Sequence, residues 1–391
     1  NTVTPSITFT SILGNHTLLG GVQGYFTRLR ETGLYVISAE DEKTSPYYGV
    51  PYTSIGKKHA NELGFFIQDE WNVTPKLTVV PGIRVDSHSS GEEYATSVKV
   101  SDSAFPTTKF SKTTVNPRIA IKYELTPSLV LRANVGTGFR APYGFSEDLH
   151  LCSGSPRVWK SSNLKGERAI SYNLSADYYA KKYQFSINIF RTNLKDKIQF
   201  SPADDEVKKF GYSYQWENVD DAYVQGVELG AKANLFRNFN AGINWTFNQG
   251  KFKHERADWS DPNDETVKEF SQRLQYAKDS RNISRFPAMT GDIDLDYTPG
   301  TWSFSLTSSL QGRMYIDYNS EDDGATSKIK KTNTFMLFNC RAAKRFGMCT
   351  VYAGAKNIFS YIQDEKHTDD AAFMYAPVYG ATWYVGLSVK L

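Results

Sequence analysis

Hydrophobic and polar residues alternate one by one along much of the chain. From Tyr183 the sequence reads Tyr-Gln-Phe-Ser-Ile-Asn-Ile, so apolar side chains occupy every second position. The same alternation runs through residues 171–178, 292–297, 302–310 and 383–391. Successive side chains of a β-strand point to opposite faces, whereas a helix repeats about every 3.6 residues. The pattern therefore predicts an all-β chain whose strands each have one apolar and one polar face.

Counting such runs predicts about fifteen strands, with ends uncertain by about two to four residues. They are expected at 5–12, 17–28, 61–73, 77–87, 113–124, 129–139, 168–180, 183–196, 213–235, 238–251, 286–298, 301–315, 332–346, 348–357 and 379–391. Most are about 11 to 14 residues long, whereas globular proteins favour about 5–6. A tilted strand needs about 9–11 residues to cross a membrane, so these strands are long enough to do so.

The predicted connections alternate strictly between short and long. Tight turns are expected at Gly14-Asn15, 74–76, 126–128, 181–182, 237–238, 299–300 and Gly347. Long loops are expected at 29–60, 88–112, 140–167, 197–212, 252–285, 316–331 and 358–378. Up-and-down membrane barrels have short periplasmic turns and long extracellular loops. The alternative is a soluble propeller, but its blades have four short strands per repeat, whereas each period here has two long ones.

Composition and motif content argue against several other classes of protein. The chain has 45 basic and 42 acidic residues, a balance unlike that of a nucleic-acid-binding protein. It contains no run of about 18 apolar residues, which a membrane helix needs, and its three cysteines are too scattered for a zinc cage. Aromatic residues make up 14% of the chain, as suits strands with rings at the lipid–water interface. Serine-hydrolase, zinc-protease and Walker motifs are missing, so we expect neither an enzyme nor a cofactor or metal site.

Several short boxes resemble, in their order along the chain, those of TonB-dependent outer-membrane receptors. The most informative is Thr137-Gly138-Phe139-Arg140-Ala141-Pro142, followed by Asn163-Leu164-Lys165-Gly166-Glu167. The others are 65–71, 81–86, Asn218–Glu228, Ala355-Lys356-Asn357-Ile358-Phe359 and Tyr379–Leu387. The resemblance covers the chain from about residue 60 to its end. It implies a transmembrane antiparallel β-barrel in the bacterial outer membrane.

Barrels of this family have twenty-two strands and an N-terminal plug. We therefore expect residues 1–391 to be the C-terminal part of such a barrel, with the plug and the first strands absent. The resemblance implies energised import: loops capture a scarce solute, and the TonB–ExbB–ExbD complex opens the plug through the missing N-terminal part. Outer-membrane lipid, a small-molecule ligand and a surface lipoprotein are the implied partners, without nucleic acid. A passive porin-like or adhesin-like barrel is the alternative.

The expected size of the parent protein favours some classes of solute over others. Scaling to twenty-two strands and adding a plug gives about 700 residues, which suits receptors for ferric siderophores, haem or cobalamin. His150 lies between two of the boxes, where haem receptors of the family place an axial ligand, although it also fits an ordinary polar loop histidine.

Six other side chains are candidate solute contacts. They combine aromatic rings with cations, which suits an anionic iron chelate: Tyr143, Arg157, Trp159, Arg313, Tyr315 and Tyr318. The alternative is that such residues pair with carboxylates on the barrel's polar wall. Asp292, Asp294 and Asp296 share the polar side of one strand, and we expect them to line that wall.

Overall fold

The computed structural model describes residues 1–35, 48–97, 105–143, 158–202, 204–208, 214–255, 281–319, 327–363 and 375–390. Within these ranges nearly every element is a β-strand, and the one helix, α1 (Asp205–Lys208), has four residues. No helix in the described ranges is long and apolar enough to cross a membrane. The expected all-β class is confirmed.

The chain divides into two compact units. Unit 1 comprises Asn1–Lys122, Asn134–Tyr172 and Thr192–Ala222, and unit 2 comprises Tyr123–Ala133, Asn173–Arg191 and Tyr223–Leu391. Five strands pass from one unit into the other: β6 (Thr108–Thr126), β7 (Leu129–Arg140), β9 (Glu167–Tyr179), β10 (Tyr183–Pro202) and β11 (Tyr214–Phe236).

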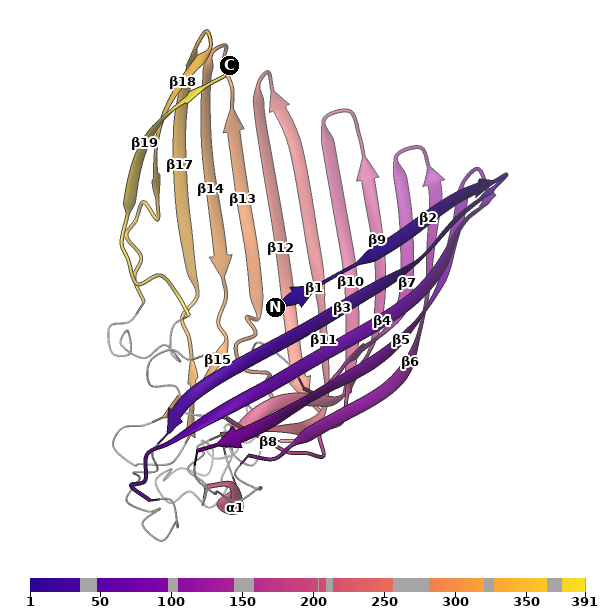
Figure 1. Ribbon diagram of the computed structural model, residues 1–391. Helices are drawn as coiled ribbons and strands as arrows, with labels where there is room; N and C mark the ends of the chain where they lie inside the picture. The colour runs from indigo at the N-terminus through magenta and orange to yellow at the C-terminus, as the bar shows by residue number, and fades with distance from the viewer. Residues whose placement is uncertain are drawn as a thin grey trace. The chain divides into compact units, whose positions relative to one another are not determined.

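Unit 1 is organised around four long neighbouring strands, drawn from indigo to purple in Figure 1. They include β3 (His16–Tyr35), which pairs antiparallel with β4 (Tyr52–Thr74), and β5 (Leu77–Thr96), which pairs with β4. Along β3 also lie β1 (Thr2–Val3) and β2 (Ser6–Leu13). The short β8 (Val158–Lys160) pairs in parallel with the start of β11.

Unit 2 contains an antiparallel series that runs in chain order. The strands are β12 (Phe239–Phe252), β13 (Met289–Tyr297), β14 (Trp302–Gln311), β17 (Phe335–Phe346), β18 (Cys349–Lys356) and β19 (Thr382–Val389). A separate hairpin, β15 (Tyr315–Asn319) and β16 (Ser327–Lys331), lies between β14 and β17 in the sequence. Each neighbouring pair is therefore antiparallel, as the alternation of turns and loops predicts.

One face of these strands is apolar and exposed to an unusual degree. On β4, Leu63, Phe65, Ile67 and Trp71 are 39–54% exposed, and on β19 Trp383, Val385, Leu387 and Val389 are 50–83% exposed. Soluble proteins bury such periodic apolar side chains, whereas a membrane strand turns them toward lipid. We call this surface the apolar face and its alternating band the apolar band. The opposite surface is the polar face.

The tight turns lie where the sequence predicts them. Gly14, Asn238, Gly300 and Gly347 have positive φ angles of 58°, 67°, 61° and 57°, a conformation that glycine and asparagine tolerate best. Aromatic rings gather beside these turns: Phe236 stacks on Phe239 at 4.7 Å, and Trp302 stacks on Phe304 at 5.6 Å. Such rings suit the boundary between hydrocarbon and water, so the short turns mark one edge of the apolar band.

The strands are longer than predicted at their other ends. β3, β4, β5 and β6 all extend into stretches where loops are expected. The alternation disappears there because both faces carry polar residues, although backbone pairing continues from Arg28↔His59 to Tyr35↔Tyr52. The small elements β1, β8, β15, β16 and α1 also have no periodic signal.

Candidate functional site

The polar face of unit 1 carries a connected network of charged and amide side chains. Arg84 is its hub: its guanidinium donates hydrogen bonds to Asp86 Oδ1 at 2.5 Å, Gln23 Oε1 at 3.1 Å and Glu62 Oε1 at 3.3 Å. Asp86 also accepts a bond from Asn116 Nδ2 at 3.2 Å. Because β3, β4, β5 and β6 each contribute a member, the network holds a charged wall in a fixed arrangement.

His88 extends this wall toward the loops. Its Nε2 lies 3.1 Å from Thr114 Oγ1, and its Nδ1 lies 3.4 Å from Glu62 Oε2. Its ring also contacts the Phe139 ring, with 4.9 Å between the centroids. His88 is therefore held between a polar network and an aromatic cluster.

A buried ion pair lies at the loop end of the same wall. Glu92 is completely buried, and its Oε1 accepts a bond from Lys160 Nζ at 2.6 Å while its Oε2 accepts one from the Tyr94 hydroxyl at 2.8 Å. Burial alone raises the pKa of Glu92, but the charges of Lys160 and Lys58 outweigh that effect and leave the pKa below its ordinary value. Glu92 is thus held ionised, and it fixes β8 to β5.

Beside this pair, Lys58 Nζ lies 3.0 Å from Glu31 Oε2, and Lys58 is 5% exposed. Two further hydroxyl groups here, Ser90 Oγ and Thr108 Oγ1, are buried and have no hydrogen-bond partner among the described residues. Charges buried this deeply are stable only when paired, so the cluster makes the loop end of β3–β6 rigid.

The Phe139 of the first receptor-like box has a packing role. Its ring lies 6.1 Å from the Phe110 ring, and Lys112 Nζ lies 5.5 Å from its centroid. A Cβ at Gly166, in the second box, would overlap this ring, so glycine is required for the close approach. The two boxes are therefore in direct contact.

Residues of two receptor-like boxes form hydrogen bonds around Asp196 of β10. Asn218 Nδ2 donates to the carbonyl oxygens of Asp196 at 2.8 Å and Lys165 at 3.0 Å, and its Oδ1 accepts from Lys165 N at 2.8 Å. Asp196 has a positive φ of 54°, and its N–H donates to Asp221 Oδ1 at 3.1 Å. The resemblance therefore rests largely on residues that anchor loops rather than on residues that must contact a solute.

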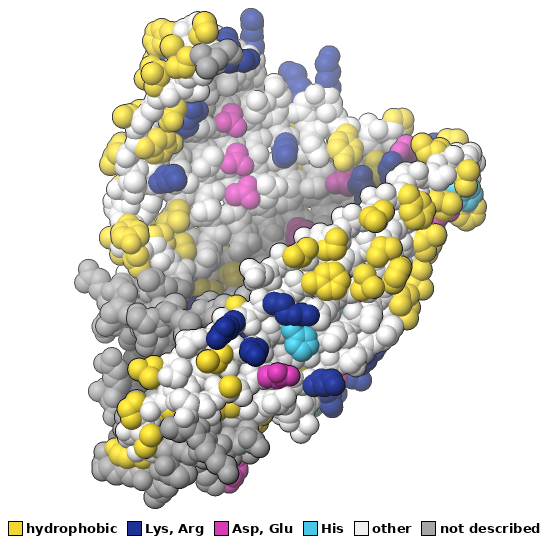
Figure 2. Space-filling model, viewed as in Figure 1, with side chains coloured by type: hydrophobic (Ala, Val, Ile, Leu, Met, Phe, Trp, Pro, Cys, Tyr) yellow, Lys and Arg dark blue, Asp and Glu magenta, His cyan; other side chains and the backbone are white. Residues whose placement is uncertain are grey.

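Unit 2 has a polar wall of its own, visible in Figure 2 as a column of acidic side chains over β13. Asp292, Asp294 and Asp296 pair across the strands with Ser309, Thr307 and Ser305 of β14. Asn244 Nδ2 donates to Asp292 Oδ2 at 2.8 Å. On the far side of β14, Arg341 lies 4.7 Å from the centroid of the Tyr352 ring. The wall thus displays carboxylates, amides, hydroxyls and a cation, as expected for a wet surface.

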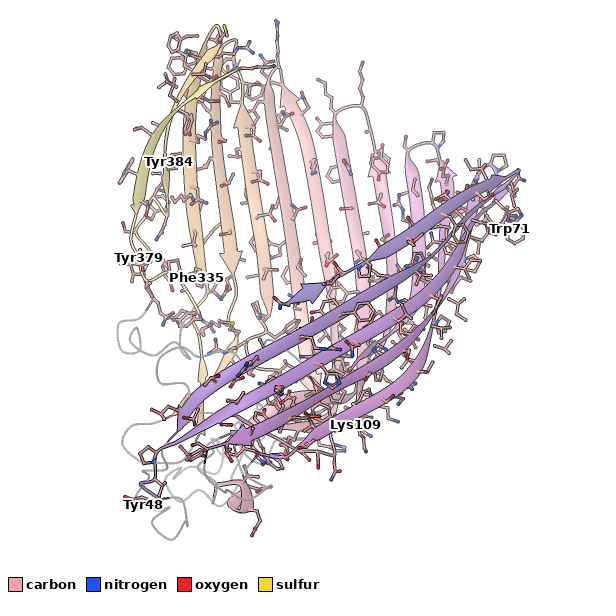
Figure 3. The ribbon with its side chains drawn as sticks, in the orientation of Figure 1. Tyr48, Trp71, Lys109, Phe335, Tyr379 and Tyr384 are labelled. Carbon is pink, nitrogen blue, oxygen red and sulfur yellow. The ribbon has the colours of Figure 1, made fainter. Side chains whose placement is uncertain are left out.

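The last long loop of unit 2 has a tightly bonded base. Asn357 has a φ of 50°, and its Nδ2 donates to the carbonyl oxygens of Tyr361 at 2.8 Å and Tyr379 at 3.1 Å. Buried Gln363 accepts from Tyr375 N at 2.8 Å through its Oε1. The Phe335 ring, labelled in Figure 3, stacks on Tyr361 with 4.8 Å between the centroids. These contacts hold residues 357–363 against residues 375–379.

The predicted contact residues have different surroundings. Tyr143 is 1% exposed; its hydroxyl donates to Ser161 O at 2.7 Å and accepts from Leu164 N at 3.1 Å, and burial raises its pKa. Trp159 in β8 is half-buried, whereas Arg313 in unit 2 is exposed and Tyr315 begins β15. His150 and Arg157 lie outside the described residues, as does the side chain of Tyr318. Their contact with a solute stays a prediction.

Comparison with known sequences gives one consistent result. Residues 1–358 match the family described as “TonB dependent receptor-like, beta-barrel”. Among curated relatives, “Vitamin B12 transporter BtuB” of Photobacterium profundum is 26% identical over 229 residues, covering 58% of this chain and 30% of the relative. “Ferric enterobactin receptor PirA” of Pseudomonas aeruginosa is 21% identical over 358 residues, covering 85% of this chain and 42% of the relative.

Solved structures agree with the fold. The chain is similar to “Copper transporter OprC” with a TM-score of 0.69 and 18% identity, covering 99% of this chain and 56% of that one. It is similar to the ferric citrate transporter FecA with a TM-score of 0.66 and 18% identity, covering 99% and 54%. The chain thus spans about half of these structures and less than half of the two curated relatives.

Proposed function

The chain belongs to the TonB-dependent receptor family, and on this premise we propose that it is part of an energised importer of a scarce small solute, either an iron complex or cobalamin. As a member of the family it is an antiparallel transmembrane β-barrel chain of the bacterial outer membrane. The apolar face is then the lipid-facing surface, and the polar face is the surface along which a solute would pass.

One observation carries the proposal: the family match extends over residues 1–358. The chain is also similar to relatives named for ferric enterobactin and for vitamin B12. The polar walls support it physically. Arg84, Asp86 and Glu62 on β4 and β5 hold one another in place, so the wall presents fixed charges without mobile side chains. Family members are receptors and transporters, and the absence of catalysis stays a prediction.

An iron complex is the first candidate. Ferric siderophores are commonly anionic, and exposed cations with aromatic rings would bind them through charge and stacking. Arg313 is exposed, and Tyr315 lies two residues farther along the chain. The other proposed contacts are His150, Arg157, Trp159 and Tyr318. We assign Tyr143 to anchoring the loop rather than to binding, because its hydroxyl already makes two hydrogen bonds.

Binding measurements on the full-length protein test the solute. Ferric enterobactin and cobalamin are titrated separately, because each is named by a relative. Arg313→Glu is expected to weaken binding of the anionic iron chelate by about tenfold, which corresponds to about 1.4 kcal/mol. Arg237→Glu, in the tight turn after β11, is the matched control and is expected to leave binding unchanged. Tight binding of cobalamin alone would exclude the iron chelate and leave the energised importer intact.

A passive barrel remains the alternative. It would let the solute enter without energy from the inner membrane, and its permeability would follow solute size. The two functions differ in one measurable property, which is whether uptake requires TonB.

A further inference from the structure

The apolar face of unit 1 carries a group of positive charges beyond its apolar band. We define the basic patch as Arg28 and Arg30 of β3, Lys57 and His59 of β4, and Lys109 of β6. In Figure 2 dark-blue and cyan side chains gather over β3 and β4, next to the yellow apolar field. Figure 3 labels Lys109 on the same strand group, at the end opposite Trp71.

Strand register places the patch on the lipid-facing side. Arg28 pairs with His59 and Arg30 with Lys57, so these four side chains share one face. Lys57 and His59 have the same parity on β4 as the exposed Leu63, Phe65 and Ile67. A Cβ on Gly91 of β5 would lie 3.0 Å from the His59 ring and 3.6 Å from Lys109 Cα, which brings β6 into the patch.

Residues next to the patch in the sequence point to the polar face. Lys58 and Glu31, each one position away from a patch residue, point to the other face and pair with each other at 3.0 Å. The patch is therefore separate from the polar wall and lies off the path proposed for the solute.

The height of the patch fits the headgroup region. The apolar band on β4 runs from Leu63 to Trp71, about the 9–11 residues that cross the hydrocarbon core. One charged residue of the same parity, Asp69, interrupts it near the tight turn, where its carboxylate lies 2.7 Å from His16 Nδ1. His59 and Lys57 lie four and six positions farther along the strand, on the order of 13–20 Å at 3.3 Å per residue. For a strand tilted by about 45°, that is about 9–14 Å above the band, on the side of the long loops.

The charges in the patch are poorly balanced by carboxylates. Arg28, Arg30, Lys57 and Lys109 give four permanent positive charges and are exposed, while Glu93, the cross-strand partner of Lys57, supplies one negative charge. Arg28 Nη1 donates to Asn61 Oδ1 at 2.6 Å. Among the described residues, Arg30, Lys57 and Lys109 have no ion-pair partner.

We propose that the basic patch binds the phosphate groups of outer-leaflet glycolipid headgroups, with the acyl chains of the lipid lying against the apolar band below. Arginine presents two parallel donors to a phosphate, and lysine adds a point charge. The basic patch lies above the apolar band. The phosphates of an anionic glycolipid lie above its acyl chains in the same order. The lipid so held would fix unit 1 against the bilayer at a defined height.

The test uses the full-length protein extracted in mild detergent and titrated with bisphosphorylated lipid A, with native mass spectrometry counting bound lipid. The triple variant Arg30→Glu, Lys57→Glu, Lys109→Glu is expected to lower lipid A affinity by about tenfold or more. Lys76→Glu, in the tight turn at the other end of β4, is the control for loss of a cation and is expected to bind like the parent. Heat-modifiable migration on a gel confirms that each variant is folded.

Two comparisons identify the bound chemistry. Lipid A without phosphates should bind the parent no better than it binds the triple variant. Inorganic phosphate at the same phosphate concentration should not displace lipid A, because it has no acyl chains to contact the band. Undiminished lipid A binding by the folded triple variant would overturn the proposal. Full displacement by inorganic phosphate would overturn the assignment to a lipid.

Discussion

Glu92 illustrates how single residues stabilise the loop end of unit 1. Its carboxylate is completely buried, a position that is costly unless the charge is paired. Lys160 Nζ at 2.6 Å and the Tyr94 hydroxyl at 2.8 Å provide that pairing. Lys160 is 68 residues away in the sequence, so no local pattern could have predicted the contact. The same holds for Tyr143, which the sequence marks as a candidate contact and which lies buried against Leu164.

Replacing Glu92 by Gln is expected to lower the free energy of unfolding at neutral pH by about 3–5 kcal/mol, because Lys160 would remain buried without its counter-ion. The folded-state pKa of Glu92 is lowered, so its contribution is complete above the ordinary pKa of about 4.3 and is lost as the pH falls through the folded value. The parent and Glu92→Gln should therefore converge in acid, as denaturant titrations at neutral and acidic pH would record. Glu93→Gln, on the opposite face, should change little, and a constant difference across this pH range would contradict the account.

Tyr143→Phe removes only a hydroxyl, but two backbone groups lose their partner, namely the half-buried Ser161 O and the buried Leu164 N. The expected loss of stability is about 1–3 kcal/mol, measured as the free energy of unfolding. Tyr179→Phe, beside the turn after β9, provides the comparison, because Tyr179 is 40% exposed and should tolerate the change. Equal effects of the two substitutions would argue against an anchoring role.

At the scale of elements, the sequence predicts the strands well where they contact lipid. Lipid imposes strict alternation, so β9 and β12 begin and end within about two residues of their expected positions, inside the usual error, and β10 begins where it is expected but runs about six residues farther. Prediction fails above the membrane, where water tolerates polar residues on both faces and the extended parts of β3–β6 lose their periodicity. It also misses β8, since a three-residue strand is fixed by its partner β11 rather than by its own sequence.

The two faces of β10 should respond oppositely to charge. Ile187→Arg places a guanidinium against lipid and is expected to cost about 2–4 kcal/mol, as seen for cations near the bilayer midplane. Asn188→Arg, one residue on, points to the polar face, where Asn188 already donates to Glu228 Oε2 at 2.9 Å. It should be nearly neutral. Unfolding free energies in lipid vesicles compare the two, and a larger penalty at position 188 would reverse the assignment of faces.

The hairpin of β18 and β19 depends on glycine facing tyrosine. Tyr352 pairs with Gly386, and Tyr384 pairs with Gly354, so each ring covers a residue without a side chain. Gly386→Val would overlap the Tyr352 ring and is expected to destabilise the barrel by about 1–3 kcal/mol. Ala353→Val adds the same kind of bulk on the lipid side and should be tolerated. A thermal unfolding midpoint that falls for both variants alike would show that the effect is not specific to the covered glycine.

At the scale of the whole molecule, both units repeat one design. Each has an apolar band on one face and a wall of paired charges, amides and hydroxyls on the other. Membership of the family explains the apolar face, which lies in lipid, and the polar face is the surface along which the proposed importer would pass its solute. Box residues such as Asn218 and Asn357 form hydrogen bonds that anchor loops. The boxes therefore identify the family but do not identify the solute.

The central claim is energised import, and its most direct test is uptake of a radiolabelled iron chelate by cells that carry the full-length protein. The cells lack any other receptor for that chelate and are compared with an otherwise identical strain without TonB. The account predicts saturable uptake that disappears when TonB is removed. Uptake at the same rate in both strains would mean that the protein is a passive barrel, and the account would be wrong.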